Sequence, residues 1–127
     1  MGVSRASIGV RSLEPATKAL ALYQASGDAI GQGLAELRLG AYETSFGTPD
    51  ASRTLLNSAR DGFQKSGAIL GEARALAELA RLERKEDNAA AAEAARGEAV
   101  LLLASLEAPL LSANQLLGLG NFGPLRV

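Results

Sequence analysis

Four basic residues recur at helical spacing in one segment of this chain: Arg74, Arg81, Arg84 and Lys85. Cations arranged along one helix face could accept an acidic peptide or a terminal carboxylate. The same segment also carries acids at i,i+3 or i,i+4 from these cations, namely Glu72, Glu78, Glu83 and Glu86. A solvated face of intrahelical ion pairs is therefore the alternative, and the number of available acids favours it.

Catalytic chemistry has few candidate residues here. The chain contains no His and no Cys, which removes the commonest general base, the commonest metal ligand and any thiolate site. The acids Glu83, Glu86 and Asp87 fall at a predicted exposed helix end, where no apolar pocket would shift their pKa values. Residues 118–123 spell G-x-G-x-x-G, but the strand, helix and later acid of a dinucleotide site do not accompany it. We expect no enzyme activity, no metal and no cofactor.

Composition narrows the class of protein further. The 127 residues carry a net charge of −1, so no overall field favours nucleic acid or an anionic membrane. Residues 1–13 lack the apolar core of a secretory signal, and the uncharged stretch 108–125 is interrupted by Pro109 and by glycines. These features predict a soluble, cytoplasmic protein. Hydrophobic residues make up 47% of the chain but aromatic residues only 4%, so Ala and Leu must form a helical core.

An internal repeat with an offset of 40 organises the chain. Residues 19–46 laid over residues 59–86 give identical pairs that include Ala19/Ala59, Gln24/Gln64, Ser26/Ser66, Gly27/Gly67, Gly31/Gly71, Ala35/Ala75, Leu39/Leu79 and Glu43/Glu83. A third copy continues the size pattern in the triplets Ala19/Ala59/Ala99, Tyr23/Phe63/Leu103 and Leu39/Leu79/Leu119. The triplet Tyr23/Phe63/Leu103 predicts a stripe of core residues repeated along the chain.

The apolar spacing and the turn residues predict six helices, at about 14–26, 29–46, 49–66, 68–85, 88–107 and 110–120. Gly27 and Gly67 should end two of them, and Pro49 should start another. Because short turns make neighbouring helices antiparallel, we expect a row of helical hairpins over residues 14–120. Residues 1–13 form an N-terminal extension that could be disordered, and residues 121–127 form a C-terminal tail.

These residues resemble the tetratricopeptide repeat in its long variety of about forty residues, similar to bacterial repeats that precede CHAT domains. The resemblance covers about residues 14–120. It is carried by the large–small pairs Leu39-Gly40, Leu79-Ala80 and Leu119-Gly120, and by the small pairs Ser52/Ala92 and Ala59/Ala99. Glu43, Glu83 and Arg96 depart from the family pattern. The resemblance implies an all-α, right-handed solenoid of stacked hairpins, which serves as a scaffold for a protein or peptide partner.

In the resembled family the first helix of each hairpin lines a concave groove. The implied partner-binding residues are Leu34, Leu37, Ala41, Thr44, Arg74, Ala77, Arg81, Arg84, Lys85, Asn114 and Leu117. The basic second copy implies that the partner could be acidic.

The last predicted helix is apolar and uncharged, which is unusual for the end of a repeat stack. As an alternative function we expect a self-associating repeat module, a fragment or an engineered one, that forms a homo-oligomer through Leu110, Leu111, Leu116, Leu117 and Phe122.

Overall fold

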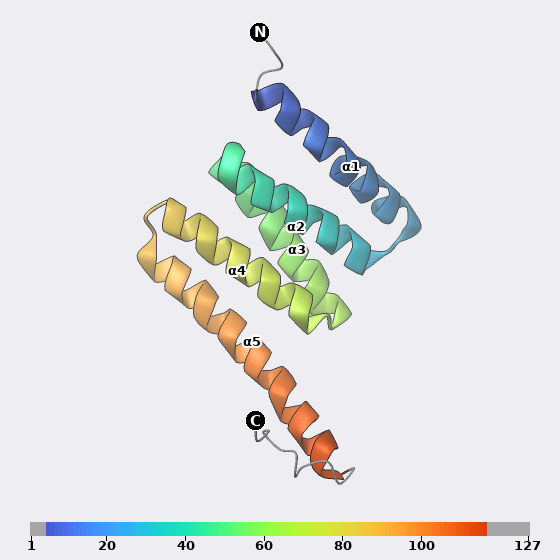
Figure 1. Cartoon of the computed structure of the whole chain (residues 1–127), viewed down its shortest axis with the longest axis vertical. Coiled ribbons are helices and arrows are strands. Elements are labelled where there is room, and N and C mark those ends of the chain that lie inside the picture. The colour runs from blue at the N-terminus through green and yellow to red at the C-terminus, as the bar shows by residue number, and fades with distance from the viewer. Residues whose placement is uncertain (1–4, 117–127) are drawn as a thin grey trace.

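The computed structural model of the chain describes the backbone of residues 5–116 and the side chains of residues 14–107. The described regular structure is entirely α-helical, in the order α1 (Arg5–Ser26), α2 (Ala29–Phe46), α3 (Pro49–Ser66), α4 (Ile69–Lys85) and α5 (Ala89–Leu116). The all-α class predicted from the sequence is thus confirmed. Each helix packs on the next, and α2 also packs on α4. Figure 1 shows α1 at one end of the molecule and α5 at the other.

The turns form where the sequence places helix stops and starts. Gly27 and Gly67 adopt φ values of 75° and 71°, the left-handed conformation that lets a helix end without a Cβ clash. Asp28 caps α2 by accepting a hydrogen bond of 2.8 Å from the amide of Gly31. Thr48 caps α3 in the same way, with its side chain accepting from Ala51 at 3.2 Å, and Pro49 occupies the first turn of that helix.

One helix start lacks a side-chain cap. Ala68 precedes α4 with φ −85° and ψ 82°, close to the φ −83° and ψ 93° of Asp28 before α2. Because this backbone already suits a capping residue, Ala68→Ser should stabilise the protein by about 0.5–1 kcal/mol. The converse change, Asp28→Ala, should destabilise it by about 1 kcal/mol. Urea unfolding followed by circular dichroism measures both changes, and equal midpoints for the two variants would contradict this account of the helix starts.

The core is built by large side chains lying on glycines of neighbouring helices. Phe63 of α3 is 1% exposed. A Cβ on Gly33 of α2 would lie 2.8 Å from its ring, and one on Gly71 of α4 would lie 2.5 Å from it. Leu56 lies on Gly40 and Tyr23 on Gly31 in the same manner. Glycine at these positions therefore lets three helices approach a single ring.

Small residues occupy the other close contacts. Ser52, Ala59, Ala92 and Ala99 are all buried. The Ser52 hydroxyl lies 2.6 Å from that of Thr44, and the two hydroxyl oxygens lie 3.0 and 3.2 Å from the carbonyl oxygen of Gly40. Because each hydroxyl has one hydrogen, one hydroxyl donates to the second, and the second donates to the carbonyl. This network satisfies the polar atoms where α2 and α3 meet. It also corrects the placement of Thr44 in the groove, because Thr44 is 4% exposed and faces α3.

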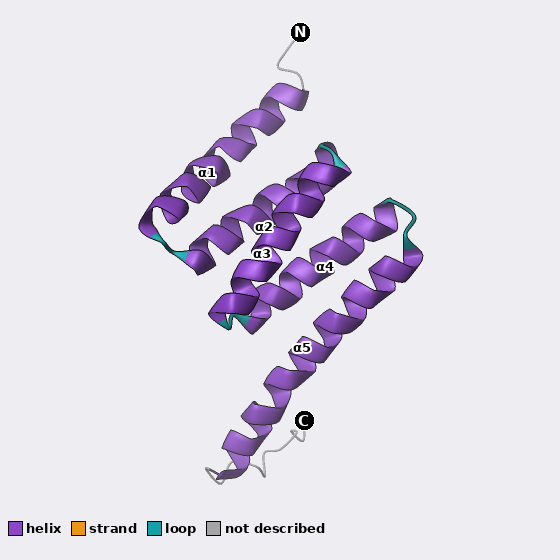
Figure 2. Cartoon of the chain, turned by 180° about the vertical axis from the view of Figure 1, so that it is seen from behind, coloured by secondary structure: helices purple, strands orange, loops and turns teal. Residues whose placement is uncertain are grey.

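The two ends of the described chain differ from the sequence prediction. Helix α1 begins at Arg5, within the segment expected to be an extension. Residues 110–116 continue α5 and do not begin a sixth helix, while residues 117–120 lie outside the described residues. The physical reason is visible at an offset of 40. Where Ser26-Gly27 and Ser66-Gly67 end their helices, the third copy has Leu106-Glu107, which contains no glycine to stop α5. Figure 2 shows α5 extending beyond α4.

No helix among residues 5–116 combines the length and the apolar character needed to cross a membrane.

The third member of the predicted core stripe, Leu103, is less covered than the other two. Leu103 is 44% exposed, although Phe63 at the corresponding position of α3 is buried.

A candidate binding groove between α2 and α4

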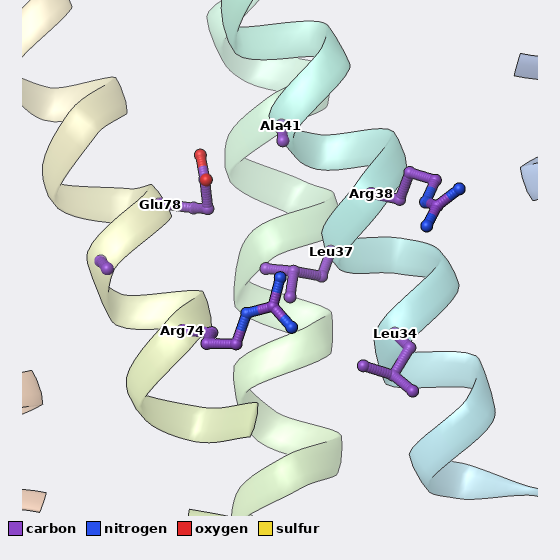
Figure 3. Close-up of a pocket in the computed structure, with 7 residues that line it drawn as sticks. Leu34, Leu37, Arg38, Ala41, Arg74 and Glu78 are labelled. Carbon is purple, nitrogen blue, oxygen red and sulfur yellow. The ribbon is translucent and has the colours of Figure 1, made fainter. Parts of the chain in front are cut away.

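A depression of about 420 Å³ lies between α2 and α4. Seven residues line it: Leu34, Leu37, Arg38, Ala41, Arg74, Ala77 and Glu78. Figure 3 shows Leu37 and Arg74 approaching each other across the middle of this space, from opposite helices. We call this depression the α2–α4 groove. Its floor is apolar and its charged groups come from both walls.

Five of the sequence-predicted partner-binding residues meet in this groove: Leu34, Leu37, Ala41, Arg74 and Ala77. They come together because α2 and α4 are packed side by side and each presents one face to the gap between them. Leu34 is 46% exposed, which leaves a large apolar side chain open to a ligand. Arg38 and Glu78 also line the groove but were not among the partner-binding residues expected from the sequence. Arg38 follows Leu34 at i+4, so the helical spacing placed it on the same face.

Two predicted cations are engaged in holding the helices together. Arg81 donates to the carbonyl of Ala41 at 3.1 Å and to the hydroxyl of Ser45 at 3.2 Å. Lys85 donates to the carbonyl of Thr44 at 2.6 Å. The Thr44 carbonyl lies in the last turn of α2, where no backbone partner follows and positive charge is favoured, and Arg81 adds a second bond to the carbonyl of Ala41 one turn earlier.

The alternative of intrahelical ion pairs therefore holds only in part. Arg81 does pair with Glu78 of its own helix, at 3.0 Å, but its other bonds and those of Lys85 cross to α2. The fourth predicted cation, Arg84, does not line the groove. It lies toward α5, where its charge helps to lower the pKa of Glu93, a shift caused mainly by the hydrogen bond from Arg96.

The groove has an excess of positive charge. Two arginines, Arg38 and Arg74, line it together with one acid, Glu78. A third arginine, Arg81, lies beside it and is bonded to that acid. Among residues 14–107, Arg38 and Arg74 make neither an ion pair nor a side-chain hydrogen bond, in contrast to Arg53, Arg60, Arg81 and Arg96. Both are exposed. Arg74 extends across the apolar floor, whereas Arg38 extends from α2 away from α4 (Figure 3). Either arginine can bind a carboxylate without first breaking an ion pair to residues 14–107.

Arg38 also borders a second depression, of about 270 Å³, between α1 and α2. Tyr23, Ala16 and Ala19 of α1 form its other wall. Leu34 and Arg38 line both depressions, so the two are adjacent on α2. A bound segment that fills the first could extend toward the second.

A separate polar cluster joins α3, α4 and the turn before α5. Arg53 binds Glu83 through two hydrogen bonds, each of 3.2 Å, and Asn88 donates to the same carboxylate at 2.9 Å. The bonds from Arg53 and Asn88 lower the pKa of Glu83 even though burial opposes this. Hydrogen bonding to Glu83 in turn raises the pKa of Arg53. The cluster ties the second hairpin to the next turn, and its Arg53 and Glu83 also border a depression of about 210 Å³.

This cluster predicts a pH dependence of stability. A carboxyl whose pKa is lower in the folded state stabilises the fold above its unfolded pKa, and that stabilisation is lost as pH falls through the folded value. We expect Glu83→Gln to lose about 1 kcal/mol at neutral pH and to show a smaller further loss on acidification than the wild type. Urea midpoints measured at neutral and acidic pH give both quantities. The control Asp61→Asn, at an exposed surface pair, should follow the wild-type profile, and a Glu83→Gln profile parallel to it would contradict the assignment.

The predicted self-association residues fall outside the described side chains. Leu110, Leu111 and Leu116 belong to the backbone of α5, and Leu117 and Phe122 lie beyond the described residues. Within the described part of the chain, no three His, Cys, Asp or Glu residues cluster as a metal site would require.

Comparison with family models, curated proteins and solved structures found no match to the chain.

Proposed function

We propose that this protein is a binding scaffold that takes an acidic, partly apolar segment of a partner protein into the α2–α4 groove. The observation that carries the proposal is that Arg38 and Arg74, which have no ion-pair partner among residues 14–107, line the groove together with the exposed apolar side chain of Leu34. An apolar floor with a few charged groups suits a peptide, because the floor supplies affinity and the charges select and orient the ligand.

The proposal includes a short right-handed solenoid of tetratricopeptide-like hairpins as the architecture behind the groove. Contacts between residues about 40 apart support it. Arg81 bonds to Ala41, and Lys85 to Ser45 at 3.4 Å, so corresponding residues of α2 and α4 lie next to each other. Regular stacking of this kind produces the extended concave surfaces that repeat proteins use for binding.

A scaffold is a better account than an enzyme because the charged residues of the groove are positioned for binding. Arg81 is bonded to the end of α2 and to Glu78, whereas within residues 14–107 Arg38 and Arg74 have no ion-pair partner. Arginine stays protonated at neutral pH and serves poorly as an acid or base. The proposed role of these residues is charge recognition.

Selection of peptides from a random phage-displayed library tests the proposal without knowledge of the natural partner. The immobilised wild-type chain should enrich sequences that combine Asp or Glu with large apolar residues. The same selection on the double variant Arg38→Glu, Arg74→Glu should lose those sequences. Failure to enrich any sequence class, or enrichment of the same class by both proteins, would refute the groove as the binding site.

A further inference from the structure

The outer face of α5 differs from that of α3, the helix that corresponds to it at an offset of 40. The outward residues of α3 are exposed and polar: Asp50, Thr54, Asn57, Asp61 and Gln64. The corresponding residues of α5 are Ala90, Ala94, Gly97, Leu101 and Ala104. A strip of exposed apolar residues along one helix face is typical of a contact surface. Something other than water should therefore contact this second face of α5.

Large apolar side chains on this face are open. Leu101 is 71% exposed, the largest value among the exposed large hydrophobic residues of the described chain, and its neighbour Val100 is 51% exposed. A continuation of the helix stack would not cover Leu101, whose counterpart on α3 is the exposed Asp61, but it would partly cover Val100, whose counterpart Arg60 is half-buried and bonded to Glu98 of α5. The matching face of α3 stays exposed although α3 has helices on both sides of it in the stack. Among residues 14–107 no side chain covers Leu101, which leaves it open to contact with a second molecule.

Gly97 lies in the middle of this face. Gly31, Gly33, Gly40 and Gly71 each receive a large side chain from an adjacent helix, whereas a Cβ at Gly97 would have nothing within 4 Å. Glycine inside a helix costs about 0.5–1 kcal/mol relative to Ala. The space above Gly97 is thus of the kind that this protein elsewhere fills with a ring or a Leu.

The outer residues are also self-complementary. Positions 90, 94, 97, 101 and 104 alternate by four and three, the spacing of a coiled-coil seam. In an antiparallel pair of α5 helices centred on residue 99, residues whose numbers sum to 198 face each other. Leu101 then lies on Gly97 of the second copy, and Ala94 lies opposite Ala104. The largest side chain of the seam meets the smallest.

The charges at the edges of this face are compatible with such a pair. Glu98 is bound by Arg60 at 2.9 Å and Glu93 by Arg96 at 3.1 Å. Val100 is at the edge of this face, and in the same register it lies opposite Glu98 of the second copy, whose carboxylate is already paired with Arg60. No unpaired cation lines the seam, so nothing at these edges calls for a separate anionic partner.

We infer that two copies of this chain associate through an antiparallel α5–α5 contact, in which Leu101 of each copy fills the space over Gly97 of the other. This surface is separate from the α2–α4 groove. It also differs from the self-association residues expected from the sequence, which lie further along the chain. A single helix pair buries less than the roughly 800 Å² per partner of a standard interface, so we expect a dissociation constant in the micromolar range.

Sedimentation equilibrium of the full chain over a micromolar to millimolar series tests the association. The mass should rise from the 13.0 kDa of one chain to that of two. Leu101→Glu should remain a single chain throughout, while Leu22→Glu, at an equally open residue of α1, should behave as the wild type. A mass that stays at one chain for the wild type, or a dimer unaffected by Leu101→Glu, would overturn the inference.

The variant Gly97→Leu distinguishes the proposed register from nonspecific hydrophobic association. Leu favours helix more than Gly does, so the monomer should keep its helical content by circular dichroism even if Leu101→Glu does not. The added side chain blocks the space for Leu101 and should weaken dimerisation about tenfold or more. Tighter association of this more apolar variant would contradict the register.

Disulfide formation between introduced cysteines tests the register directly, because the chain contains no Cys of its own. A mixture of Ala94→Cys and Ala104→Cys chains should form a disulfide-linked dimer on mild oxidation. Ala94→Cys alone should not, since in the antiparallel pair its two copies are 104 − 94 = 10 residues apart, about 15 Å, beyond the roughly 7 Å that a disulfide spans. Linkage of Ala94→Cys alone, or none in the mixture, would refute the arrangement. The double variant Arg38→Glu, Arg74→Glu should still dimerise, which keeps this test independent of the groove.

Discussion

Phe63→Ala should destabilise the protein by about 3–5 kcal/mol. The ring is almost fully buried and is in contact distance of the Cβ positions of Gly33 and Gly71, so its removal leaves a cavity bounded by three helices. Glycine backbones cannot fill that cavity by changing rotamer. Because a domain of this size is stable by only about 5–15 kcal/mol, the variant should unfold at a much lower urea concentration.

Phe46→Ala is the matched control for this prediction. It removes the same ring from a residue that is 66% exposed, where the ring contacts Tyr42 with centroids 5.0 Å apart. The loss there should be about 1 kcal/mol or less. Equal losses for the two variants, measured by urea unfolding with circular dichroism, would show that Phe63 does not join the three helices as described.

A double-mutant cycle tests the contact between ring and glycine itself. Gly33→Ala alone should cost about 1–3 kcal/mol, because the new Cβ would press on the Phe63 ring. Combined with Phe63→Leu, the same change should cost less than the sum of the two single changes. Strict additivity would mean that the close approach of α2 to Phe63 contributes nothing.

The second large effect concerns the α2–α4 groove. Arg74→Glu should lower the affinity for an acidic peptide, selected on the wild-type chain, by about tenfold or more, because it replaces an attraction with a repulsion beside the apolar floor. Fluorescence anisotropy with a labelled peptide measures this change. Raising the salt concentration should weaken wild-type binding in the same direction, since the groove charges are exposed.

Arg84→Glu is the control for Arg74→Glu. It makes the same charge change on the same helix, but Arg84 lies toward Glu93 and outside the groove. Affinity should therefore stay within about threefold of the wild type. If both variants lose affinity equally, the effect comes from overall charge, and the groove does not direct the binding.

Much of the fold could be predicted from local signals in the sequence. Gly27, Gly67, Thr48 and Pro49 set helix ends through backbone conformation and capping, which depend only on near neighbours. The apolar spacing predicted the extents of α2, α3 and α4. The end of α5 was mispredicted, because the sequence pattern predicts a helix end at 107 and a sixth helix from 110, whereas α5 continues through Pro109 to Leu116 in the absence of a glycine stop at Glu107.

The groove was partly predictable for a similar reason. The positions of Leu34, Leu37 and Ala77 follow from the helical spacing once α2 and α4 are set side by side. The roles of Arg81 and Lys85 could not be read from spacing, because their bonds go to carbonyls of α2 that become neighbours only after packing. Arg74 and Arg81 look alike in sequence, and tertiary contact distinguishes a free cation from an engaged one.

The most direct test of the binding scaffold is a methyl nuclear magnetic resonance titration with the selected acidic peptide. The account predicts that the largest shifts fall on Leu34, Leu37, Ala41 and Ala77, with little change at Leu55 of α3 or at Leu101 of α5 in a sample held at constant protein concentration. Shifts concentrated on α3 or α5, or the same groove shifts in the Arg38→Glu, Arg74→Glu variant, would contradict it.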